Sequence, residues 1–343
     1  MPHAGFRAQV AVAGEALIDL IGRPDGALVP CHGGALYNLS RALALQAIPT
    51  TYLNPISSDR FGRELRAHLL DVGVELAQPE PVNAVTSLAV VAVDAQGVPD
   101  YAFYRSAVAD RQITLHMLNA SCAARPSLQV VCTGALALDP ADKALYLPWM
   151  TTQADVGRLV VVDANIRLAV MPEVEAYRQH VLQALALAGL VKVSDEDLAG
   201  LRLPGATAFD QAEGLLARVR AKALILTLGG EGAALLLPDG RQWFARDHGL
   251  IELADTIGAG DCFLAGFLAA LIEHAHAFNT TPGAALQAID EGAASALLSR
   301  GIASASCCVA ERGCVPPRAA QVRARLPGIR VSRRGAATQA DAA

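Results

Sequence analysis

The chain has 343 residues, of which 53% are hydrophobic and 18% are charged. This supplies enough buried core for one large α/β domain or two smaller ones. The formal net charge is −5 and no long basic run occurs, so an electrostatic basis for binding nucleic acid is missing. The apolar runs are shorter than the roughly 20 residues of a membrane span, and Glu15 interrupts the apolar start before a signal-peptide core can form. We therefore expect a soluble cytoplasmic protein that binds no nucleic acid and no membrane.

Strand-like and helix-like segments alternate along the chain. A β-branched apolar run ends at Gly14-Glu15 and predicts a first buried strand followed by a loop at the sheet edge. Later strand-like runs are separated by Ala/Leu-rich helical stretches; they cover residues 128–136, 158–167, 190–198 and 222–237. This alternation predicts an α/β fold whose mostly parallel central sheet is covered by helices on both faces.

One region breaks the alternation. Residues 85–105 contain two strand-like runs around the turn signal Asp94-Ala95-Gln96-Gly97, with no helix between them. We interpret this region as a hairpin that projects from the main domain. The segments 1–7 and 330–343 are polar or small without periodicity, and we expect both to be disordered.

The seven cysteines stand at irregular spacing. Such spacing favours neither a disulfide framework nor a paired CxxC zinc site. We expect these cysteines to act as small buried hydrophobic residues.

Polar residues follow several of the predicted strands. In open parallel sheets, ligands bind beyond the carboxyl ends of the strands, so these positions are candidate site residues. They are Asp19, Asp163, Asn165, Arg167, Ser194, Asp197, Gly229 and the run 255–261.

The segment Gly258-Ala259-Gly260-Asp261 precedes the apolar run 262–272. If a helix begins here, its unpaired backbone N–H groups and positive dipole end form an anion site, and the glycines let a phosphate approach the backbone. A carboxylate there could accept a proton from a hydroxyl as the phosphate arrives. The alternative is that Asp261 only caps the helix. No G-x-x-x-x-G-K-[ST] loop occurs, so the phosphate grip cannot be of the Walker type.

The complete run Asp255-Thr256-Ile257-Gly258-Ala259-Gly260-Asp261 resembles the DTxGAGD signature of the ribokinase-like, or PfkB, family of carbohydrate kinases. Matching segments extend from about residue 10 to residue 317. The resemblance implies a three-layer α/β/α sandwich with a mostly parallel central sheet over residues 8–320. It also implies a small β lid formed by insertions at about 15–34 and 85–110.

The resemblance assigns Asp261 as the catalytic base and Gly258, Ala259 and Gly260 as the anion hole. "GEALIDL" and "GGALYNLSRALA" are similar to the amino-terminal signature of the family, and "FYRSAVADRQI" is similar to its fructokinase branch. The implied substrate-binding residues are Asp19, Gly33, Gly34, Asn38, Arg105, Asn165 and Arg167. The alternatives are a surface-loop acid for Asp19, an ordinary helix residue for Asn38, a solubilising hairpin residue for Arg105 and a partner of a structural acid for Arg167.

"VDANIR" resembles D-P-N-x-R with Ala164 in place of proline, and "KVSDEDL" resembles K-x-N-x-x-E with Ser194 and Asp197 substituted. Asp197 is implied as an Mg²⁺ ligand, directly or through water, or else is a solvated acid at a helix start. Asp255 is implied as a K⁺ ligand. The implied nucleotide-binding residues are Lys192, Ser194, Thr227, Gly229, Gly232, Thr256 and Ala294.

The implied activity is transfer of the γ-phosphoryl group of ATP to a primary hydroxyl of a small sugar, with Mg²⁺ and K⁺ as the expected ions. Fructose, giving fructose 6-phosphate, is the expected substrate. A 2-keto-3-deoxygluconate kinase or ribokinase is the alternative, followed by a sugar-binding regulatory protein without turnover. The hairpin is expected to cover the sugar as a lid, and similar kinases pair through their lids, so a homodimer is expected.

Overall fold

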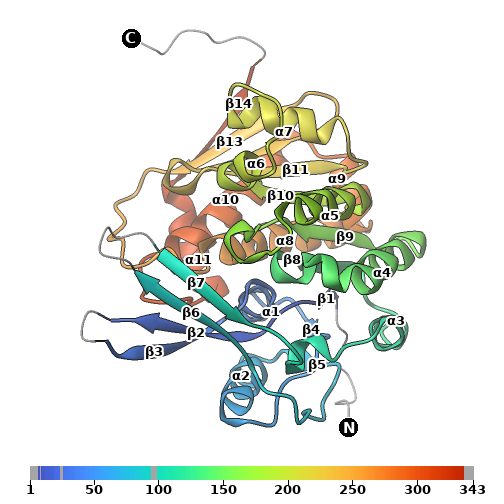
Figure 1. Cartoon of the computed structure of the whole chain (residues 1–343). Coiled ribbons are helices and arrows are strands. Elements are labelled where there is room, and N and C mark those ends of the chain that lie inside the picture. The colour runs from blue at the N-terminus through green and yellow to red at the C-terminus, as the bar shows by residue number, and fades with distance from the viewer. Residues whose placement is uncertain (1–6, 8, 24–25, 94–98, 336–343) are drawn as a thin grey trace.

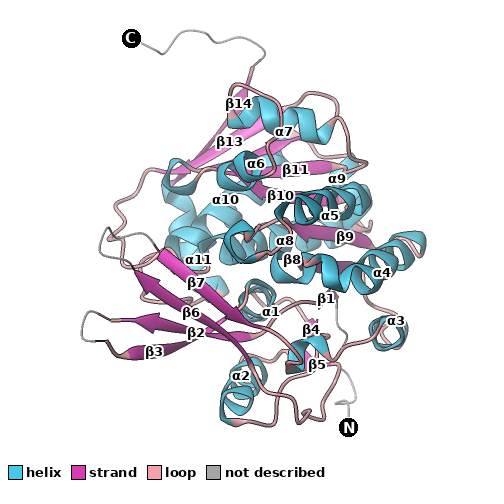
Figure 2. Cartoon of the chain, in the orientation of Figure 1, coloured by secondary structure: helices cyan, strands magenta, loops and turns pink. Residues whose placement is uncertain are grey.

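A computed structural model describes residues 7, 9–23, 26–93 and 99–335 of the chain. A large sheet runs through the molecule with helices on both of its faces, and a smaller sheet projects from one end (Figures 1 and 2). The fold class predicted from the sequence is therefore confirmed.

The large sheet has ten strands in the order β14-β13-β12-β11-β10-β9-β8-β1-β4-β5. Pairing is parallel from β11 through to β5, and β12, β13 and β14 are antiparallel. The strands are β1 (Val10–Val12), β4 (Thr50–Tyr52), β5 (Glu75–Leu76), β8 (Val130–Gly134), β9 (Leu159–Asp163), β10 (Leu190–Ser194), β11 (Ala223–Thr227), β12 (Ala233–Leu236), β13 (Gln242–Asp247) and β14 (Ile329–Arg334).

The first strand, β1, has β4 on one side and β8 on the other. The chain order reverses direction at this point, and such a switch point opens a crevice at the carboxyl ends of the strands. β1 is fully buried, and its residues Val10 and Val12 face one hydrophobic core while Ala11 faces the other. The sheet therefore separates two cores, as expected for a three-layer sandwich.

Helices on one face pack into the first core; they are α1 (Ala35–Leu45), α8 (Ala259–Ala277), α9 (Pro282–Gln287), α10 (Glu291–Cys308) and α11 (Ala319–Arg325). The opposite face carries α3 (Leu115–Ala123), α4 (Lys143–Asp155), α5 (Val174–Leu187), α6 (Asp195–Gly200) and α7 (Ala208–Leu216). Helix α2 (Arg60–Asp71) packs in a third, smaller core.

Helix α8 is the central element of the first layer. Every residue from Asp261 to Ile272 is buried, as the apolar run in the sequence predicted. Close packing against α10 depends on Gly266 and Gly301, because a Cβ on Gly266 would lie 2.5 Å from the carbonyl oxygen of Arg300. The amino-terminal end of α8 is thus held rigidly by the core.

The smaller sheet has four strands in the order β3-β2-β6-β7. They are β2 (Leu17–Gly22), β3 (Leu28–Gly33), β6 (Ser87–Val93) and β7 (Pro99–Tyr104). β6 and β7 pair as an antiparallel hairpin, and the predicted turn at 94–97 lies outside the described residues. The sheet extends away from the main sandwich beside α1 and α2 (Figure 1).

The prediction that the chain is disordered from residue 330 is wrong for its described part. Helix α11 is followed by β14, which pairs with β13 over six residues, from Ile329 to Arg334. The short, mostly polar sequence gives a weak strand signal: only Ile329 is buried and only Val331 also packs against the core, so backbone pairing with β13 supplies much of what holds it. Residues 336–343 lie outside the description. Within the described ranges, no helix combines the length and hydropathy needed to cross a bilayer.

Candidate active site

The glycine turn at 258–260 forms the amino-terminal end of α8. Gly258 precedes the first helical residue with φ 75°, in the left-handed region that favours glycine, and no side chain caps the helix. The alternative that Asp261 serves only as a helix cap is therefore wrong. The N–H of Ala259 donates to the carbonyl oxygen of Thr256 at 3.3 Å. Because the first N–H groups of a helix have no partner within it, the other N–H groups of this turn are donors at the amino-terminal end of α8.

Asp261 is the third residue of α8 and only 6% of its surface is exposed. Its Oδ2 accepts a hydrogen bond from Asn38 Nδ2 of α1 at 3.0 Å. Burial raises the pKa of Asp261 to about 7, and the nearby negative charge of Asp163 adds to this effect. A carboxyl group with a pKa near neutrality can both accept and return a proton at physiological pH.

A buried ion pair lies beneath the turn. Lys192 Nζ on β10 donates to both carboxylate oxygens of Asp163 on β9, at 2.8 and 2.9 Å. A Cβ placed on Gly260 would lie 3.3 Å from the same nitrogen. Burial acts to lower the pKa of Lys192, but the combined negative charges of Asp163, Asp197 and Asp261 and the hydrogen bond to Asp163 outweigh it. The pKa of Lys192 is therefore raised, and the ammonium group stays charged beside the anion site.

Asp19 lies on β2 of the smaller sheet and approaches Gly33 at the end of β3. A Cβ on Gly33 would lie 2.1 Å from Asp19 Oδ2, so this carboxylate occupies space that only a glycine leaves free. Burial raises the pKa of Asp19 to about 6. The surface-loop alternative for Asp19 is wrong, since the residue is half-buried in a strand. The next residue, Gly34, has φ 104° and precedes α1; a Cβ there would lie 2.6 Å from the carbonyl oxygen of Glu15.

Arg105 is buried rather than exposed on the hairpin. Its guanidinium group donates to the carbonyl oxygen of Leu136 at 3.1 Å and lies 3.5 Å from Asp110 Oδ2. The solubilising alternative is therefore wrong. These interactions are with the protein, so a contact between Arg105 and sugar stays a prediction.

One pocket joins several of the predicted residues at the carboxyl ends of β9 and β10. It measures about 200 Å³, and its lining includes Asn165, Arg167, Ser194, Glu196 and Asp197. Asn165 has φ 38°, a left-handed conformation that turns the chain sharply after β9. The structure thus brings together side chains that stand up to 32 positions apart in the sequence.

Arg167 is exposed at this pocket and donates to the carbonyl oxygens of Asn165 and Ile166, each at 3.1 Å. The structure records no ion pair of Arg167 among the described residues, so the alternative of a structural acid as its partner finds no support. Its positive charge lowers the pKa of Asp19 and Asp261 against the larger effect of burial. A contact between Arg167 and an anionic substrate stays a prediction.

Ser194 and Asp197 cap α6. Ser194 Oγ accepts from the N–H of Asp197 at 3.0 Å, and Asp197 Oδ2 accepts from the N–H of Ser194 at 2.8 Å. Asp197 Oδ1 accepts from the N–H of Ile166 at 2.8 Å. The alternative of a solvated acid is wrong because Asp197 is buried, and each of its oxygens already holds a backbone group. Its role as a metal ligand stays a prediction.

Most of the predicted nucleotide-binding residues lie at strand ends or in loops, whereas Ala294 lies in the core. Ser194 and Thr227 pair across the carboxyl ends of β10 and β11, and Thr256 is exposed beside the glycine turn. Gly229 and Gly232 follow β11 with φ 52° and 130°. Ala294 is different: it has no exposed surface because it faces the core from α10, so the prediction that it contacts a nucleotide is wrong.

Asp255 braces the glycine turn. Its Oδ1 accepts from the N–H of Ile257 and its Oδ2 from the N–H of Gly313, both at 3.0 Å. These bonds tie the turn to the loop that follows α10. Binding of K⁺ by Asp255 stays a prediction.

Glu15 is a site residue to which the sequence interpretation gave no role. It follows β1 at the switch point of the sheet, and one oxygen accepts from the N–H of Ala35 at 2.8 Å. Its Oε2 is buried and has no hydrogen-bond partner among the described residues. Arg105 Nε is likewise buried without a partner there. Burial raises the pKa of Glu15 to about 7. Its position directly after the first buried strand was the signal that could have identified it.

Comparisons with known proteins identify the family of the chain. Residues 7–320 match the model of the pfkB family of carbohydrate kinases. The chain is 31% identical to fructokinase-1 of Oryza sativa subsp. japonica over 288 residues, 79% of this chain and 85% of the relative. It is 31% identical to fructokinase of Escherichia coli over 268 residues, 77% of this chain and 84% of the relative.

Among solved structures, the fold is similar to that of fructokinase from Vibrio cholerae O395 in its fructose, ADP and calcium ion bound form. The TM-score is 0.75 with 24% identity, over 93% of this chain and 99% of the other. At this identity the likeness shows the fold alone. The family match, together with the relatives above 30% identity, establishes that this chain belongs to the pfkB family of carbohydrate kinases, which are sugar phosphotransferases.

Proposed function

We propose that the protein transfers the γ-phosphoryl group of ATP to the primary hydroxyl of fructose, giving fructose 6-phosphate. The observation that carries this proposal is the position of Asp261: a buried carboxylate with a pKa of about 7, held by Asn38, at the open amino-terminal end of α8. The curated fructokinases at 31% identity support fructose as the sugar.

In this proposal Asp261 accepts the proton of the sugar hydroxyl as its oxygen attacks the phosphorus. The backbone N–H groups of residues 258–260 stabilise the charge on the transferring phosphoryl group, which is the main contribution that a protein makes to this reaction. Lys192 adds a fixed positive charge directly beneath Gly260. Because its partner Asp163 holds it, this charge is in place before the substrate arrives.

Asp19 and Asn38 are proposed to orient the sugar. A carboxylate can accept hydrogen bonds from two adjacent hydroxyl groups. Asn38 uses Nδ2 for Asp261, while its Oδ1 is buried without a partner among the described residues and is free to accept from a sugar hydroxyl. We add Glu15 to this set, because its unpartnered Oε2 lies at the same edge of the sheet.

The residues present fit an ATP-bound Mg²⁺ ion. The pocket after β9 and β10 offers oxygen donors from Asn165, Ser194 and Asp197, and Mg²⁺ in nucleotide sites keeps several waters and few protein ligands. Asp197 would hold it through water, since both carboxylate oxygens accept backbone N–H groups. When bound, the ion neutralises charge on the phosphates. K⁺ beside Asp255 is proposed on the motif resemblance alone.

We propose that the smaller sheet closes over the sugar and excludes water, which competes as a phosphoryl acceptor. Its edge strands β3 and β7 have one unpaired side each, and Leu28 and Tyr104 on them are 50% and 61% exposed. Open edges and exposed apolar side chains support pairing of two lids in a cytoplasmic homodimer. Light scattering coupled to size exclusion tests the dimer: a mass of a single 35.7 kDa chain at micromolar concentration would refute it.

A coupled ADP-release assay tests the function across fructose, ribose, 2-keto-3-deoxygluconate, tagatose and adenosine. We expect the highest kcat/KM with fructose. A higher value with 2-keto-3-deoxygluconate or ribose would assign the alternative activities of the same family. Tight sugar binding without turnover on any of the five would contradict catalysis.

A further inference from the structure

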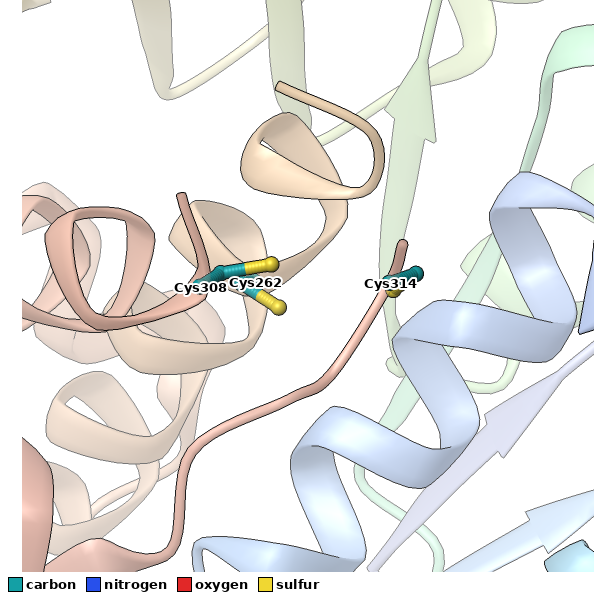
Figure 3. Close-up of side chains that lie close together, drawn as sticks. All are labelled: Cys262, Cys308 and Cys314. Carbon is teal, nitrogen blue, oxygen red and sulfur yellow. The ribbon is translucent and has the colours of Figure 1, made fainter. Parts of the chain in front are cut away.

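Cys262 converges behind the glycine turn with two cysteines that lie more than 40 positions later in the sequence, Cys308 and Cys314. Cys262 lies in the first turn of α8, Cys308 is the last residue of α10, and Cys314 lies in the loop that follows (Figure 3). Their sulfur atoms all lie within 4.8 Å of one another, and all three thiols are free. The expectation that the cysteines are only small buried hydrophobic residues does not account for this cluster.

The surroundings of the cluster connect it to the turn. Cys308 Sγ lies 3.6 Å from the carbonyl oxygen of Ile257. Cys314 Sγ packs against Gly258, where a Cβ would lie 2.2 Å from it. Cys262 and Cys308 are fully buried, whereas Cys314 is half-buried in a loop.

Three thiol groups in one small volume are typical of sites for soft metal ions. Thiolates select d¹⁰ ions such as Zn²⁺ and Cd²⁺ over the oxygen-seeking Mg²⁺ and K⁺. A Zn–S bond of about 2.3 Å in tetrahedral geometry places sulfur atoms about 3.8 Å apart. The cluster reaches this spacing if its longest separation contracts by about 1 Å, which the loop carrying Cys314 can supply.

We propose that Cys262, Cys308 and Cys314 form a three-thiolate binding site for one thiophilic metal ion of the Zn²⁺ class. Each thiol loses its proton to solvent as its sulfur binds the ion. The carbonyl oxygen of Ile257 or a water molecule completes the fourth position. The bound ion cross-links the loop after α10 to the first turn of α8. The proposed metal site adjoins the glycine turn, but the proposal does not rest on the proposed kinase reaction.

Titration with Cd²⁺ tests the proposal, because cadmium thiolates absorb in the ultraviolet through charge transfer. The full chain, reduced and freed of metal, is titrated in the presence of a competing chelator. We expect one Cd²⁺ per chain, a charge-transfer band that saturates at that ratio, and a higher Tm. Cys314→Ser should lose the band and at least tenfold in affinity. Cys307→Ser is the matched control, since Cys307 is adjacent to Cys308 but outside the cluster.

Alkylation of the wild-type protein provides a test that needs no variant. Bound Cd²⁺ should protect Cys314, the half-buried member of the cluster, from alkylation, as peptide mass spectrometry can show. The reactivity of Cys31 and Cys307 should stay unchanged. The proposal is overturned if the reduced wild-type chain takes up no Cd²⁺, if Cys314→Ser and Cys307→Ser bind it equally, or if the protected cysteines are others.

Discussion

Asn38 on α1 and Asp261 on α8 are joined by a hydrogen bond of 3.0 Å across 223 positions of the chain. This bond fixes one oxygen of the carboxylate, and the other is left for the substrate. Because α1 follows directly from β3, the same bond links the smaller sheet to the catalytic helix. In the proposed mechanism, adjacent atoms therefore position both the sugar and the group that accepts its proton.

Replacing Asp261 by asparagine should remove the base without disturbing the site. The amide oxygen of the new side chain can still accept from Asn38, so sugar and ATP affinities should change less than threefold. The kcat should fall at least about 10²-fold. Steady-state kinetics and calorimetric binding measure the two effects. Asp195→Asn, an exposed acid at the start of α6, is the control and should keep wild-type kcat; retention of kcat within a few-fold in Asp261→Asn would show that another group is the base.

Activity should depend on pH through Asp261. A general base acts in its ionised form, and the pKa of Asp261 is about 7. The kcat/KM for sugar should therefore rise about tenfold per pH unit below 7 and level off above it. Measuring kcat/KM for the sugar against pH at saturating ATP checks this dependence. An enzyme whose kcat/KM is flat between pH 5.5 and 7 would contradict the assignment.

The same carboxylate should make the fold less stable as pH rises. The folded-state pKa of about 7 lies above the ordinary value of 3.8, so folding favours the protonated form. That contribution is complete below about pH 4 and is lost as the pH rises through 7. Asp261→Asn has no such charge to bury and should be more stable than wild type at pH 8, by about 1 to 4 kcal/mol. Urea unfolding should show a much smaller difference at pH 5; an equal difference at both pH values would argue against a buried ionised Asp261.

Gly33→Ala should displace Asp19, because the added Cβ would lie 2.1 Å from Oδ2 of that carboxylate. If Asp19 orients the sugar, the sugar KM should rise at least about tenfold while the KM for ATP changes little. Gly230→Ala is the control, since open space surrounds Gly230 and its φ is not positive. Equal sugar KM values in the two variants would remove Asp19 from the sugar site.

The local sequence was sufficient to predict the alternating strands and helices, the hairpin and the glycine turn. Each depends on signals within about fifteen residues: buried β-branched runs, a turn sequence, and a glycine pair before an apolar helix. The strand β14 was missed because two alternating apolar residues, Ile329 and Val331, are too short a pattern among arginines. Its pairing with β13 is a long-range backbone interaction. The sequence pattern could not assign a role to Asp197, because an acid at the start of a helix can equally cap that helix or bind a metal ion.

The sequence by itself determined the fold class, the family and the position of Asp261, because these are written in contiguous motifs and in local periodicity. Only the tertiary structure decided that Asp261 faces Asn38, that Lys192 lies beneath Gly260, that Arg105 is buried and that three cysteines converge. These relationships join segments that are distant in the chain. They depend on how α1, α8 and α10 pack against the sheet, and no local pattern of residues encodes a contact of that kind.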